Sequence, residues 1–409
     1  MALREIRFLL AGAVSLLLLS CATYPSKVDH FLAYLSQGRP AEAASDIRDL
    51  AFKEGDDQVV YLLEYGTAQQ MAGDYKESNK AFLKAEDLMD IKDYHSISRI
   101  TGSLLLNQGM VQYKGEDHEK ILVNAMLAVN YLMLGQLDEA QVETRKLNDK
   151  LYRYRFEGKK NYQQNPFAIY LSALIWEAGR NWDSAYIDFK KAYELNPRLE
   201  YLKEDLIRSA ARAQRFDELA KWRKEFPNIK SPPSQKLGEV VLIYQQGWGP
   251  QKQPNPAFPR VPRLYPRYSV TQGAQLEVEN LSMESAQMAV NVTDVSIQTL
   301  DEQYSDLVAQ RVGGIVTKAV IADQVRQKDN LLGDLLWLGL NLADQADLRQ
   351  WASLPSSIQI AKLRLKEGDY RIRVVGLDGA RQPSGETSAW FSVKVQNQRK
   401  HFLNWRSIQ

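Results

Sequence analysis

The side chains that most often carry out chemistry are few and scattered in this sequence. The four histidines stand at positions 30, 95, 118 and 401, and there is no His-Glu-x-x-His, Gly-x-Ser-x-Gly or Walker-type motif. The acidic stretch Glu116-Asp117-His118-Glu119 could in principle ligate a divalent cation. We favour the first turn of a helix, where carboxylates oppose the positive end of the helix dipole. The sequence therefore predicts no enzyme, no metal site and no cofactor.

The single cysteine, Cys21, follows a segment that is typical of a secretion signal. Arg4 and Arg7 form a positively charged start, and residues 8–19 form an apolar stretch of 12 residues. A transmembrane anchor is the alternative, but a helix that spans a bilayer needs about 20 residues. We therefore predict a signal peptide over residues 1–20 and a short tether over residues 21–27. With one cysteine, the chain can form no intrachain disulfide.

The end of this segment, Leu18-Leu19-Ser20-Cys21, resembles the lipobox of bacterial lipoproteins. The resemblance implies that Cys21 is lipidated, with palmitate among its acyl chains, and becomes the first residue of the mature protein. In Gram-negative lipoproteins the next residue influences sorting, and Ala22 in place of aspartate implies an outer-membrane, periplasm-facing location. Each buried methylene contributes about 0.8 kcal/mol, so several acyl chains would hold the protein to its leaflet.

The composition is that of a folded and nearly neutral protein. With 409 residues, 44% of them hydrophobic and 25% charged, the chain is long enough for large cores. A chain of this length folds into roughly two or three domains. The 52 basic and 50 acidic side chains nearly cancel, which argues against nucleic acid as a partner.

Residues 28–230 show only helical periodicity, and the clearest unit is a hairpin over residues 119–151. Apolar residues recur at helical spacing on both sides of Gly135, a residue that can take the left-handed conformation at a turn. Residues 61–90 and 167–197 resemble tetratricopeptide repeats, in which small residues let two helices approach. We predict a tetratricopeptide-like α-solenoid over residues 28–230, with a concave surface that binds a partner.

After the linker Ser231-Pro232-Pro233-Ser234 the pattern changes to that of β-strands. Strands are predicted at residues 239–244, 275–279, 288–300, 357–365, 370–377 and 390–396. The fold class is thus α + β and multidomain, with an antiparallel β-sandwich-like domain over residues 236–409 and a helical insertion at residues 302–351. The Pro-Pro linker predicts two independently folded pieces.

Two further segments leave alternatives open. Residues 248–267 contain six prolines and should be stiff and extended, with unpaired backbone groups. They form either an arm that docks on a protein or glycan or a connection along the β domain. Residues 331–343 are apolar nearly all round but too short to span a bilayer, and they form either a core helix or an exposed docking helix.

Several stretches resemble an uncharacterised family of bacterial envelope lipoproteins. The stretches are Tyr113 to Glu119, Ala128 to Gly135 with Asn130 and Tyr131, Val142 to Asn148, Asn165-Pro166-Phe167, Gly238 to Val241, and Asp344 to Trp351 with Leu354-Pro355. The resemblance implies tetratricopeptide-like helices and a C-terminal β-rich part. It also implies genes placed near those of penicillin-binding-protein activator lipoproteins, and it brings no activity.

The sequence thus leads to a non-enzymatic outer-membrane lipoprotein that acts as a periplasmic protein-binding scaffold in envelope assembly or maintenance. The alternative is a glycan- or peptidoglycan-binding module that uses the C-terminal β domain through Trp248 and the Pro-rich segment. Besides the lipidated Cys21, the candidate partner-binding residues are Tyr113, Glu116, Glu119, Asn130, Tyr131, Glu143, Arg145, Trp248, Arg260 and Arg263. For Glu143 and Arg145, salt bridges within the chain or solvent exposure are the alternative.

Overall fold

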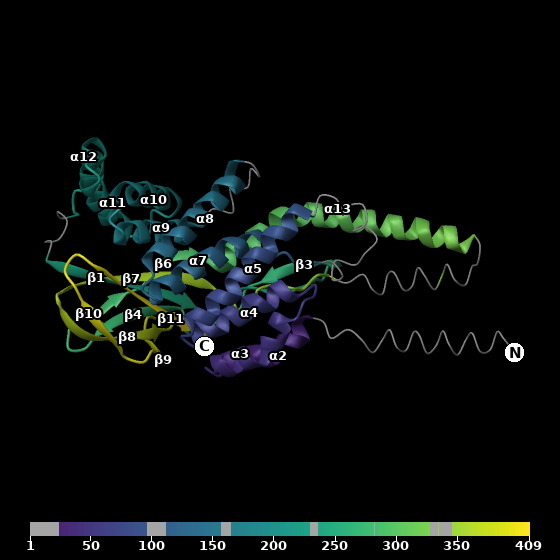
Figure 1. Cartoon of the computed structure of the whole chain (residues 1–409). Helices are drawn as coiled ribbons and strands as arrows, with labels where there is room; N and C mark the ends of the chain where they lie inside the picture. The colour runs from purple at the N-terminus through teal and green to yellow at the C-terminus, as the bar shows by residue number, and fades with distance from the viewer. Residues whose placement is uncertain are drawn as a thin grey trace.

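The computed structural model describes residues 24–95, 112–156, 165–229, 236–281, 283–327, 334 and 346–409. The predicted signal peptide, Cys21 and the Pro-Pro linker lie outside these residues, as does the apolar stretch 331–343 except for Asp334. The described chain forms a layer of helices that packs on β-sheets, and one long helix extends away from this body (Figure 1).

The N-terminal part is a tetratricopeptide-like helical repeat, in which each helix packs against the next in chain order (Figure 1). The helices are α2 (Tyr24–Ser36), α3 (Pro40–Phe52), α4 (Gln58–Met71), α5 (Tyr75–His95), α7 (Asp117–Met133), α8 (Leu137–Phe156), α9 (Pro166–Ala178), α10 (Trp182–Leu195), α11 (Tyr201–Arg212) and α12 (Phe216–Glu225). The first helix begins at Tyr24, so residues 24–27 are helical and not part of a tether. Tyr24 itself is buried, together with Val28 and Phe31 of the same helix.

Two glycines show how the helix pairs are built. Gly135 follows α7 with a φ of 71°, and the next amide, of Gln136, donates to the Tyr131 carbonyl at 2.8 Å. This pattern closes a helix with a left-handed residue, so the predicted turn at Gly135 is confirmed. In the α4–α5 pair, a Cβ added to Gly66 would lie 2.5 Å from Cε1 of Phe82. Only glycine allows these two helices to approach so closely.

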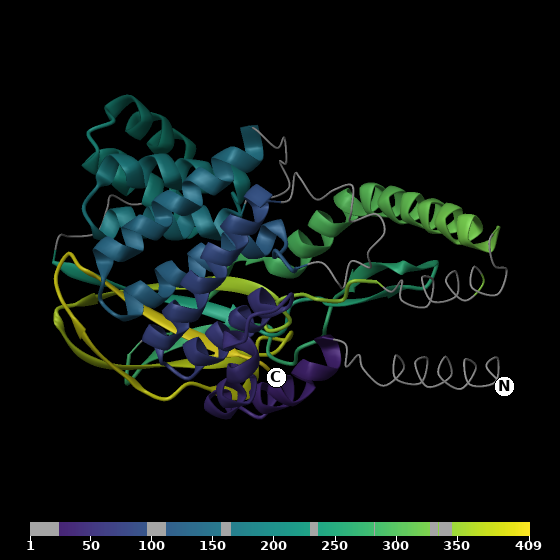
Figure 2. The same cartoon turned by 45° about the vertical axis from the view of Figure 1, so that its right-hand side comes forward.

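The helices alternate between an inner and an outer position. In α4, α7 and α9 nearly every residue is buried, including polar ones such as Glu64, Asn124 and Ser172. In contrast, α8 and α10 bury a single stripe, as an amphipathic surface helix does. The inner helices therefore lie between the outer helices and the strands. Figure 2 shows the helices crossing over the strands.

The described residues of the C-terminal part form three β-sheets. Their strands are β1 (Leu237–Gln246), β2 (Gln251–Asn255), β3 (Phe258–Tyr265), β4 (Gly273–Val278), β5 (Met283–Ser285), β6 (Gln287–Asn291), β7 (Ser357–Lys366), β8 (Gly368–Leu377), β9 (Pro383–Thr387), β10 (Phe391–Val395) and β11 (Lys400–Ser407). The inner sheet has the order β11-β1-β7-β6, and the outer sheet has the order β10-β8-β4-β5 with β9 beside β8. The strands β2 and β3 form a separate hairpin.

The inner sheet is covered on both faces. Val240 and Leu242 pack with side chains of the outer sheet, such as Leu276 and Val374, in one core. The neighbouring residue Val241, which points the opposite way, belongs to a second core that is continuous with the helical repeat. Because helices and strands share this second core, the structure does not support two independently folded pieces.

One pairing in the inner sheet differs from the antiparallel sheet that the sequence predicts. Strand β11 lies parallel to β1, with Glu239 opposite Lys400 and Ser407 opposite Gln246. The other pairings are antiparallel. The C-terminal part is therefore a mixed β structure. Strand β11 was not predicted because its residues, Lys400 to Ser407, mix charged and aromatic side chains without a clear apolar alternation.

The helical insertion begins earlier than predicted. Strand β6 ends at Asn291, and the 35-residue helix α13 (Val292–Arg326) follows directly, so residues 292–300 are not a strand. Asn291 caps this helix, because its Oδ1 accepts from the Asp294 amide at 3.1 Å. The β-branched residues after it favour a strand locally, and the cap together with the contacts of α13 with β3, α7 and β7 overrides that preference. Residues 346–351, predicted as the end of the insertion, are not helical.

The Pro-rich segment is neither unpaired nor laid along the β domain. Its residues form the β2–β3 hairpin, in which Gln251 pairs with Tyr265 and Pro254 lies opposite Pro262. This hairpin and α13 contact each other and extend together beyond the body (Figure 2). We refer to α13 and the β2–β3 hairpin as the projecting arm.

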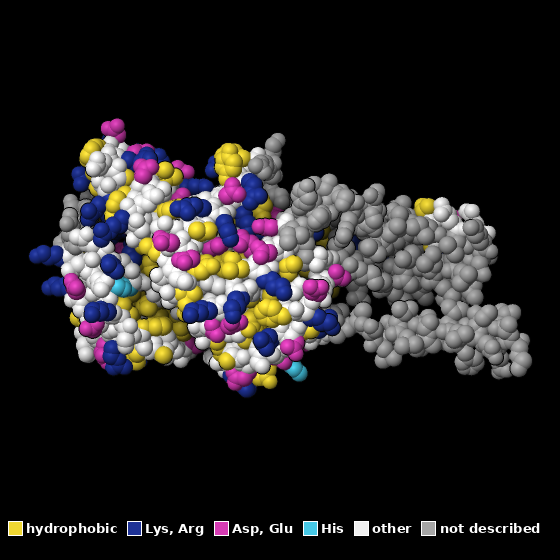
Figure 3. Space-filling model, viewed as in Figure 1, with side chains coloured by type: hydrophobic (Ala, Val, Ile, Leu, Met, Phe, Trp, Pro, Cys, Tyr) yellow, Lys and Arg dark blue, Asp and Glu magenta, His cyan; other side chains and the backbone are white. Residues whose placement is uncertain are grey.

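The surface carries charges of both signs. On the face shown in Figure 3, basic and acidic side chains are interspersed over the helices. Among the described residues, the structure contains no helix whose length and apolar character would let it cross a membrane.

Candidate functional site

A segment that is neither helix nor strand, residues 346–356, runs along the inner helices, and we call it the inner segment. The Trp351 amide donates to Oε1 of Glu119 at 2.7 Å. The amides of Ala352 and Ser353 donate to the two carboxylate oxygens of Glu64, at 2.6 and 3.1 Å. Two buried carboxylates, one on α4 and one on α7, therefore bind the backbone of a turn in this segment from the C-terminal part.

The side chain of Trp351 anchors the inner segment between α4 and α5. Its indole Nε1 donates to the Thr67 hydroxyl at 2.8 Å, and its ring lies 5.5 Å from the Phe82 ring, centroid to centroid. Only 3% of the Trp351 surface is exposed. A buried tryptophan with a satisfied N–H is among the strongest anchors that one chain segment can offer another.

The start of the inner segment is fixed by charged side chains. Arg349 forms ion pairs with Asp347 at 2.6 Å and with Asp57 at 3.1 Å, and its guanidinium lies over the Tyr113 ring. The Lys252 ammonium donates to the Arg349 carbonyl at 3.0 Å and pairs with Glu116 at 2.5 Å. The base of the projecting arm is thereby tied to the start of α7.

The pKa of two carboxyl groups here is shifted in opposite directions. Burial raises the pKa of Glu64 to about 7, although hydrogen bonds from Tyr24 and the backbone oppose this rise. Burial also acts to raise the pKa of Glu116, but the nearby Lys252 ammonium outweighs it and holds the pKa below its ordinary range. The environments of the two groups differ because Glu116 has a cation within contact distance.

Three of the candidate residues from the sequence surround the inner segment. Tyr113 is buried and donates its hydroxyl to Oε2 of Glu119 at 2.6 Å. Glu116 and Glu119 form a capping box, in which each side chain accepts from the backbone of the other's position. The predicted helix start over residues 116–119 is confirmed by this box. Among the described residues, no group of three or more His, Cys, Asp or Glu side chains could hold a metal ion.

Asn130 lies in a buried polar network. Its amide accepts from Gln70 at 2.7 Å and donates to Ser78 and Asn79 at 2.8 and 2.9 Å. Gln70 in turn accepts from Gln245 of β1 at 2.8 Å. The network joins three helices to the inner sheet and leaves the Asn130 side chain fully engaged.

The other candidates on the helices lie apart from the inner segment. Tyr131 is half-buried, and burial raises its pKa. Glu143 is buried, accepts from Asn124 at 2.7 Å and pairs with Lys146 at 3.0 Å. Arg145 is exposed and lies over the Trp176 ring, 5.2 Å from its centroid. Glu143 thus forms a salt bridge within the chain, which was the alternative to partner binding.

The candidates from the Pro-rich segment divide between the body and the projecting arm. Trp248 is half-buried against the helical core, and the Arg267 guanidinium lies 4.9 Å from its ring centroid. Arg260 and Arg263 are on β3 in the arm, and Arg263 lies over the Tyr304 ring of α13. Trp248 is therefore not a free stacking surface, whereas Arg263 is exposed.

The inner surface of the repeat is thus filled by the chain itself. The sequence predicts that a concave surface of the solenoid binds a partner, but the inner sheet and the inner segment occupy the surface of α4, α7 and α9. The prediction of a free concave surface was wrong, because the inner sheet of the same chain packs on the inner helices through apolar and polar contacts. A partner must use another surface.

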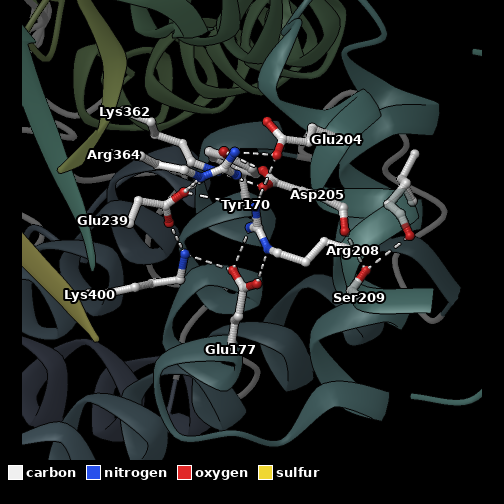
Figure 4. Close-up of polar contacts among 11 residues, drawn as sticks. Tyr170, Glu177, Glu204, Asp205, Arg208, Ser209, Glu239, Lys362, Arg364 and Lys400 are labelled. Carbon is white, nitrogen blue, oxygen red and sulfur yellow. Dashed lines mark hydrogen bonds and ion pairs between the residues drawn. The ribbon is translucent and has the colours of Figure 1, made fainter. Parts of the chain in front are cut away.

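A second cluster of charged side chains joins helices to the inner sheet, and we call it the ion cluster. Asp205 on α11 accepts from Lys362 of β7 and from Arg208, both at 2.5 Å, and from the Tyr170 hydroxyl at 2.7 Å (Figure 4). Glu177 on α9 pairs with Arg208 at 2.6 Å and Lys400 of β11 at 2.7 Å. Buried charges are stable only when paired in this way.

The ion cluster strongly perturbs its members. Burial alone would raise the pKa of Glu177, but Arg208 and Lys400 lower it to about 2. Glu239 of β1, which contacts Lys400 and Lys362, also has a pKa far below its ordinary range for the same reason. Sequence reasoning missed this cluster. The available signal was the pair of basic residues, Lys362 and Arg364, at alternate positions of a predicted strand.

A pocket of about 110 Å³ opens beside the ion cluster, between the α9–α10 turn, α11 and the ends of β1 and β11. We call it the arginine pocket. Its lining residues include Glu177, Arg180, Trp182, Arg208, Arg212, Glu239, Arg364, Arg399 and Lys400. A pocket with this composition can bind a small anionic group, because cations outnumber carboxylates in its wall.

Comparisons with known proteins add fold likeness only. No protein-family model matches the chain, and no curated protein matches it. A MamA structure from Desulfovibrio magneticus RS-1 is 16% identical and covers 49% of this chain and 90% of its own, with a TM-score of 0.33. A Podosopora anserina putative kinesin light chain with nearly identical TPR-like repeats is 11% identical and covers 50% of this chain and 93% of its own, with a TM-score of 0.35. The helical-repeat assignment of this chain rests on its own stacked helix pairs.

Proposed function

We propose that this chain is a non-enzymatic lipoprotein of the outer membrane that faces the periplasm and acts as a protein-binding scaffold in the cell envelope. The secretion signal and the lipobox ending at Cys21 support the location. The stacked helices braced by β-sheets support the scaffold role, because such an assembly offers a large, rigid surface. The projecting arm is the observation that carries the proposal.

The projecting arm has the properties of a docking element. It extends beyond the body, and α13 packs along β3 and contacts α7 and β7 (Figures 1 and 2). Val312 and Val320 on α13 are 48% and 52% exposed. Apolar side chains on an extension of this kind mark a surface that a partner covers.

The arm is firmly joined to the body, as a docking element must be. Asn255 of the hairpin hydrogen-bonds the Tyr304 hydroxyl of α13, and Lys252 at the hairpin's base pairs with Glu116. Arg263 lies opposite Gln253 in the hairpin, with its guanidinium over the same tyrosine. We therefore retain Arg260 and Arg263 as partner-binding residues and assign buried Glu119 and Asn130 to support of the fold.

A photo-crosslinking residue placed in the arm tests the proposed function in cells. With the crosslinker at Arg263 or at Val312, we expect one envelope protein to be captured and identified by mass spectrometry. The matched control is Arg381, which is also exposed but lies in the turn between β8 and β9. Capture of the same proteins from all three positions would contradict a specific docking arm.

The anchor is tested separately. We expect that Cys21→Ser leaves the protein as an unprocessed precursor or releases it from the membrane, because no lipid can then be attached. Membrane flotation measures this, with Thr23→Ser as the matched substitution that keeps the cysteine. Unchanged flotation of the fully exported Cys21→Ser protein would show that another part of the chain holds the membrane.

The alternative function, glycan binding by the β part through Trp248, lacks a free aromatic ring at that position. A different pocket, at the junction of the two parts, offers chemistry for an anionic group.

A further inference from the structure

We propose that the arginine pocket is a binding site for the carboxylate group of a small organic acid. The pocket lies at the junction of the helical and β parts and shares no lining residue with the inner segment or the projecting arm. The site is therefore separate from the docking surface proposed above.

The charges on the floor of the pocket are internally balanced. Lys400 pairs with both Glu177 and Glu239, and Arg364 pairs with Glu204. Arg208 pairs with Glu177 and with Asp205. These pairs hold the inner sheet against α9 and α11, and they leave no excess of positive charge for a ligand.

The rim of the pocket, in contrast, carries cations in excess. Arg180, Arg212 and Arg399 are exposed and line the pocket, and none of them forms an ion pair with another described residue. They come from three distant parts of the chain: the α9–α10 turn, the end of α11 and the turn before β11. Three guanidinium groups around one small opening attract an anion, and their planar forks suit a carboxylate.

Arg180 is held at the rim by an unusual backbone conformation. Its φ is 60°, in the turn that ends α9, where the Asn181 amide donates to the Trp176 carbonyl at 2.9 Å. Glycine adopts this conformation without the cost that a side chain brings. The next hairpin has the same turn, with Gln214 at a φ of 57°, but Gln214 does not line the pocket. The two turns form a natural pair for comparison.

The size of the pocket and the carboxylates in its wall define the ligand further. One water molecule needs about 10–15 Å³ of cavity volume. The pocket volume of about 110 Å³ therefore admits a carboxylate and the atoms next to it, but not a whole sugar ring. The Trp182 ring at the rim is not a free surface, because the Arg212 guanidinium lies over it, 5.5 Å from its centroid, and this contact holds Arg212 at the opening. A monoanionic carboxylate is preferred to a phosphate dianion because Glu177 and Glu239 lie in the same wall.

The test uses the full mature chain in detergent and two sugars that differ in one group. N-acetylmuramic acid carries a carboxylate, and N-acetylglucosamine lacks it. By calorimetric titration we expect the acid to bind at least about tenfold more tightly, the factor that one charge-assisted hydrogen bond supplies. We choose this acid as the probe because of the proposed periplasmic location. The crosslinking test at Arg263 does not depend on whether the acid binds, so the two proposals can fail separately.

The turn pair supplies the decisive variants. Arg180→Gly should weaken binding of N-acetylmuramic acid about tenfold while leaving the melting temperature the same or higher, since it removes a strained conformation. Gln214→Gly makes the same backbone change outside the pocket and should leave binding unchanged. Equal binding of both sugars, equal effects of the two variants, or stronger binding of inorganic phosphate than of the acid would each overturn the proposal.

Discussion

Glu64 is a carboxyl group that the fold places in an environment that disfavours its charge. It is fully buried on α4 and accepts from the Tyr24 hydroxyl at 2.8 Å and from two backbone amides of the inner segment. These hydrogen bonds favour the ionised form, but the loss of hydration outweighs them and the pKa rises to about 7. A group of this kind makes stability depend on pH near neutrality.

The sign of that dependence follows from proton binding. Between the ordinary pKa of 4.5 and about 7, the folded protein holds a proton on Glu64 that the unfolded chain has released. Stability is therefore fully present below pH 4.5 and falls as the pH rises to 7. At about 1.4 kcal/mol per pKa unit, the fall is of the order of 3 kcal/mol.

Denaturant unfolding of the wild type and of Glu64→Gln measures this contribution. As the pH rises from 4.5 to 7, the unfolding free energy of the wild type should fall relative to that of Glu64→Gln. Above pH 7 the difference between the two proteins should be constant. Glu54→Gln, at an exposed position, is the control and should track the wild type. A difference for Glu64→Gln that does not vary with pH would contradict the raised pKa.

Gly66 is the residue-scale test of helix packing. In Gly66→Ala the added Cβ would meet the Phe82 ring at 2.5 Å, so α4 and α5 must separate or the ring must move. We expect a loss of about 1–3 kcal/mol of stability, the usual cost of overpacking a core. Gly55→Ala is the matched change, because no atom lies within 4 Å of its added Cβ. Thermal unfolding distinguishes the two, and equal midpoints would contradict the close approach.

At the scale of elements, the inner segment links the helical repeat to the sheets. It has neither helical nor strand periodicity, yet its backbone and its Trp351 ring are bound by α4, α5 and α7. The helices were identifiable from their apolar spacing, and Trp351 stood in a stretch that resembles the lipoprotein family. Its binding site was not identifiable, because Glu64 and Ala352 are separated by 288 positions.

Truncation of Trp351 tests the strength of this link. Trp351→Ala should cost about 3–5 kcal/mol, and Trp351→Phe should cost less because the ring contact with Phe82 is largely kept. The control is Trp390→Ala on the outer sheet, where the ring is half-exposed and lies beside Arg371 and Arg373. Chemical denaturation gives the values, and a loss for Trp351→Ala no larger than for Trp390→Ala would exclude an anchoring role.

At the scale of the whole molecule, the helical and β parts behave as one structural unit. They share an apolar core, the inner segment and the ion cluster, which together cover the inner sheet. Each part would expose this surface if the other were absent. We therefore expect one cooperative unfolding transition for the described part of the chain.

Asp205→Asn tests this coupling. The change leaves the buried Lys362 ammonium without its nearest carboxylate, which should cost about 3–5 kcal/mol. Far-ultraviolet circular dichroism and tryptophan fluorescence should both report the lower stability, because helices and strands unfold together. Asp183→Asn, in an exposed ion pair with Arg215 at 2.8 Å, is the control and should change little. Separate transitions for the two signals would contradict a single unit.

The sequence by itself determined the elements that depend on neighbouring residues. Apolar spacing and the turn at Gly135 predicted the helical repeat, a β-branched apolar run predicted β1, and strand patterns separated by turn signals predicted β7 and β8. The sequence-based prediction failed where local preference and the final structure differ. Residues 292–300 were predicted as a strand, but they belong to a helix that Asn291 caps. It also failed for β11, whose parallel partner β1 lies far away in the chain.

Only the tertiary structure decided which surfaces face each other. The helical spacing of α4, α7 and α9 shows that they are buried, but it does not reveal that the chain's own inner sheet covers them. The ion cluster and the arginine pocket depend on residues from α9, α11, β1, β7 and β11, and each charge alone looks like an ordinary surface charge. The physical reason is that hydrophobic burial is non-directional, so a sequence pattern specifies that a face is covered without specifying by what.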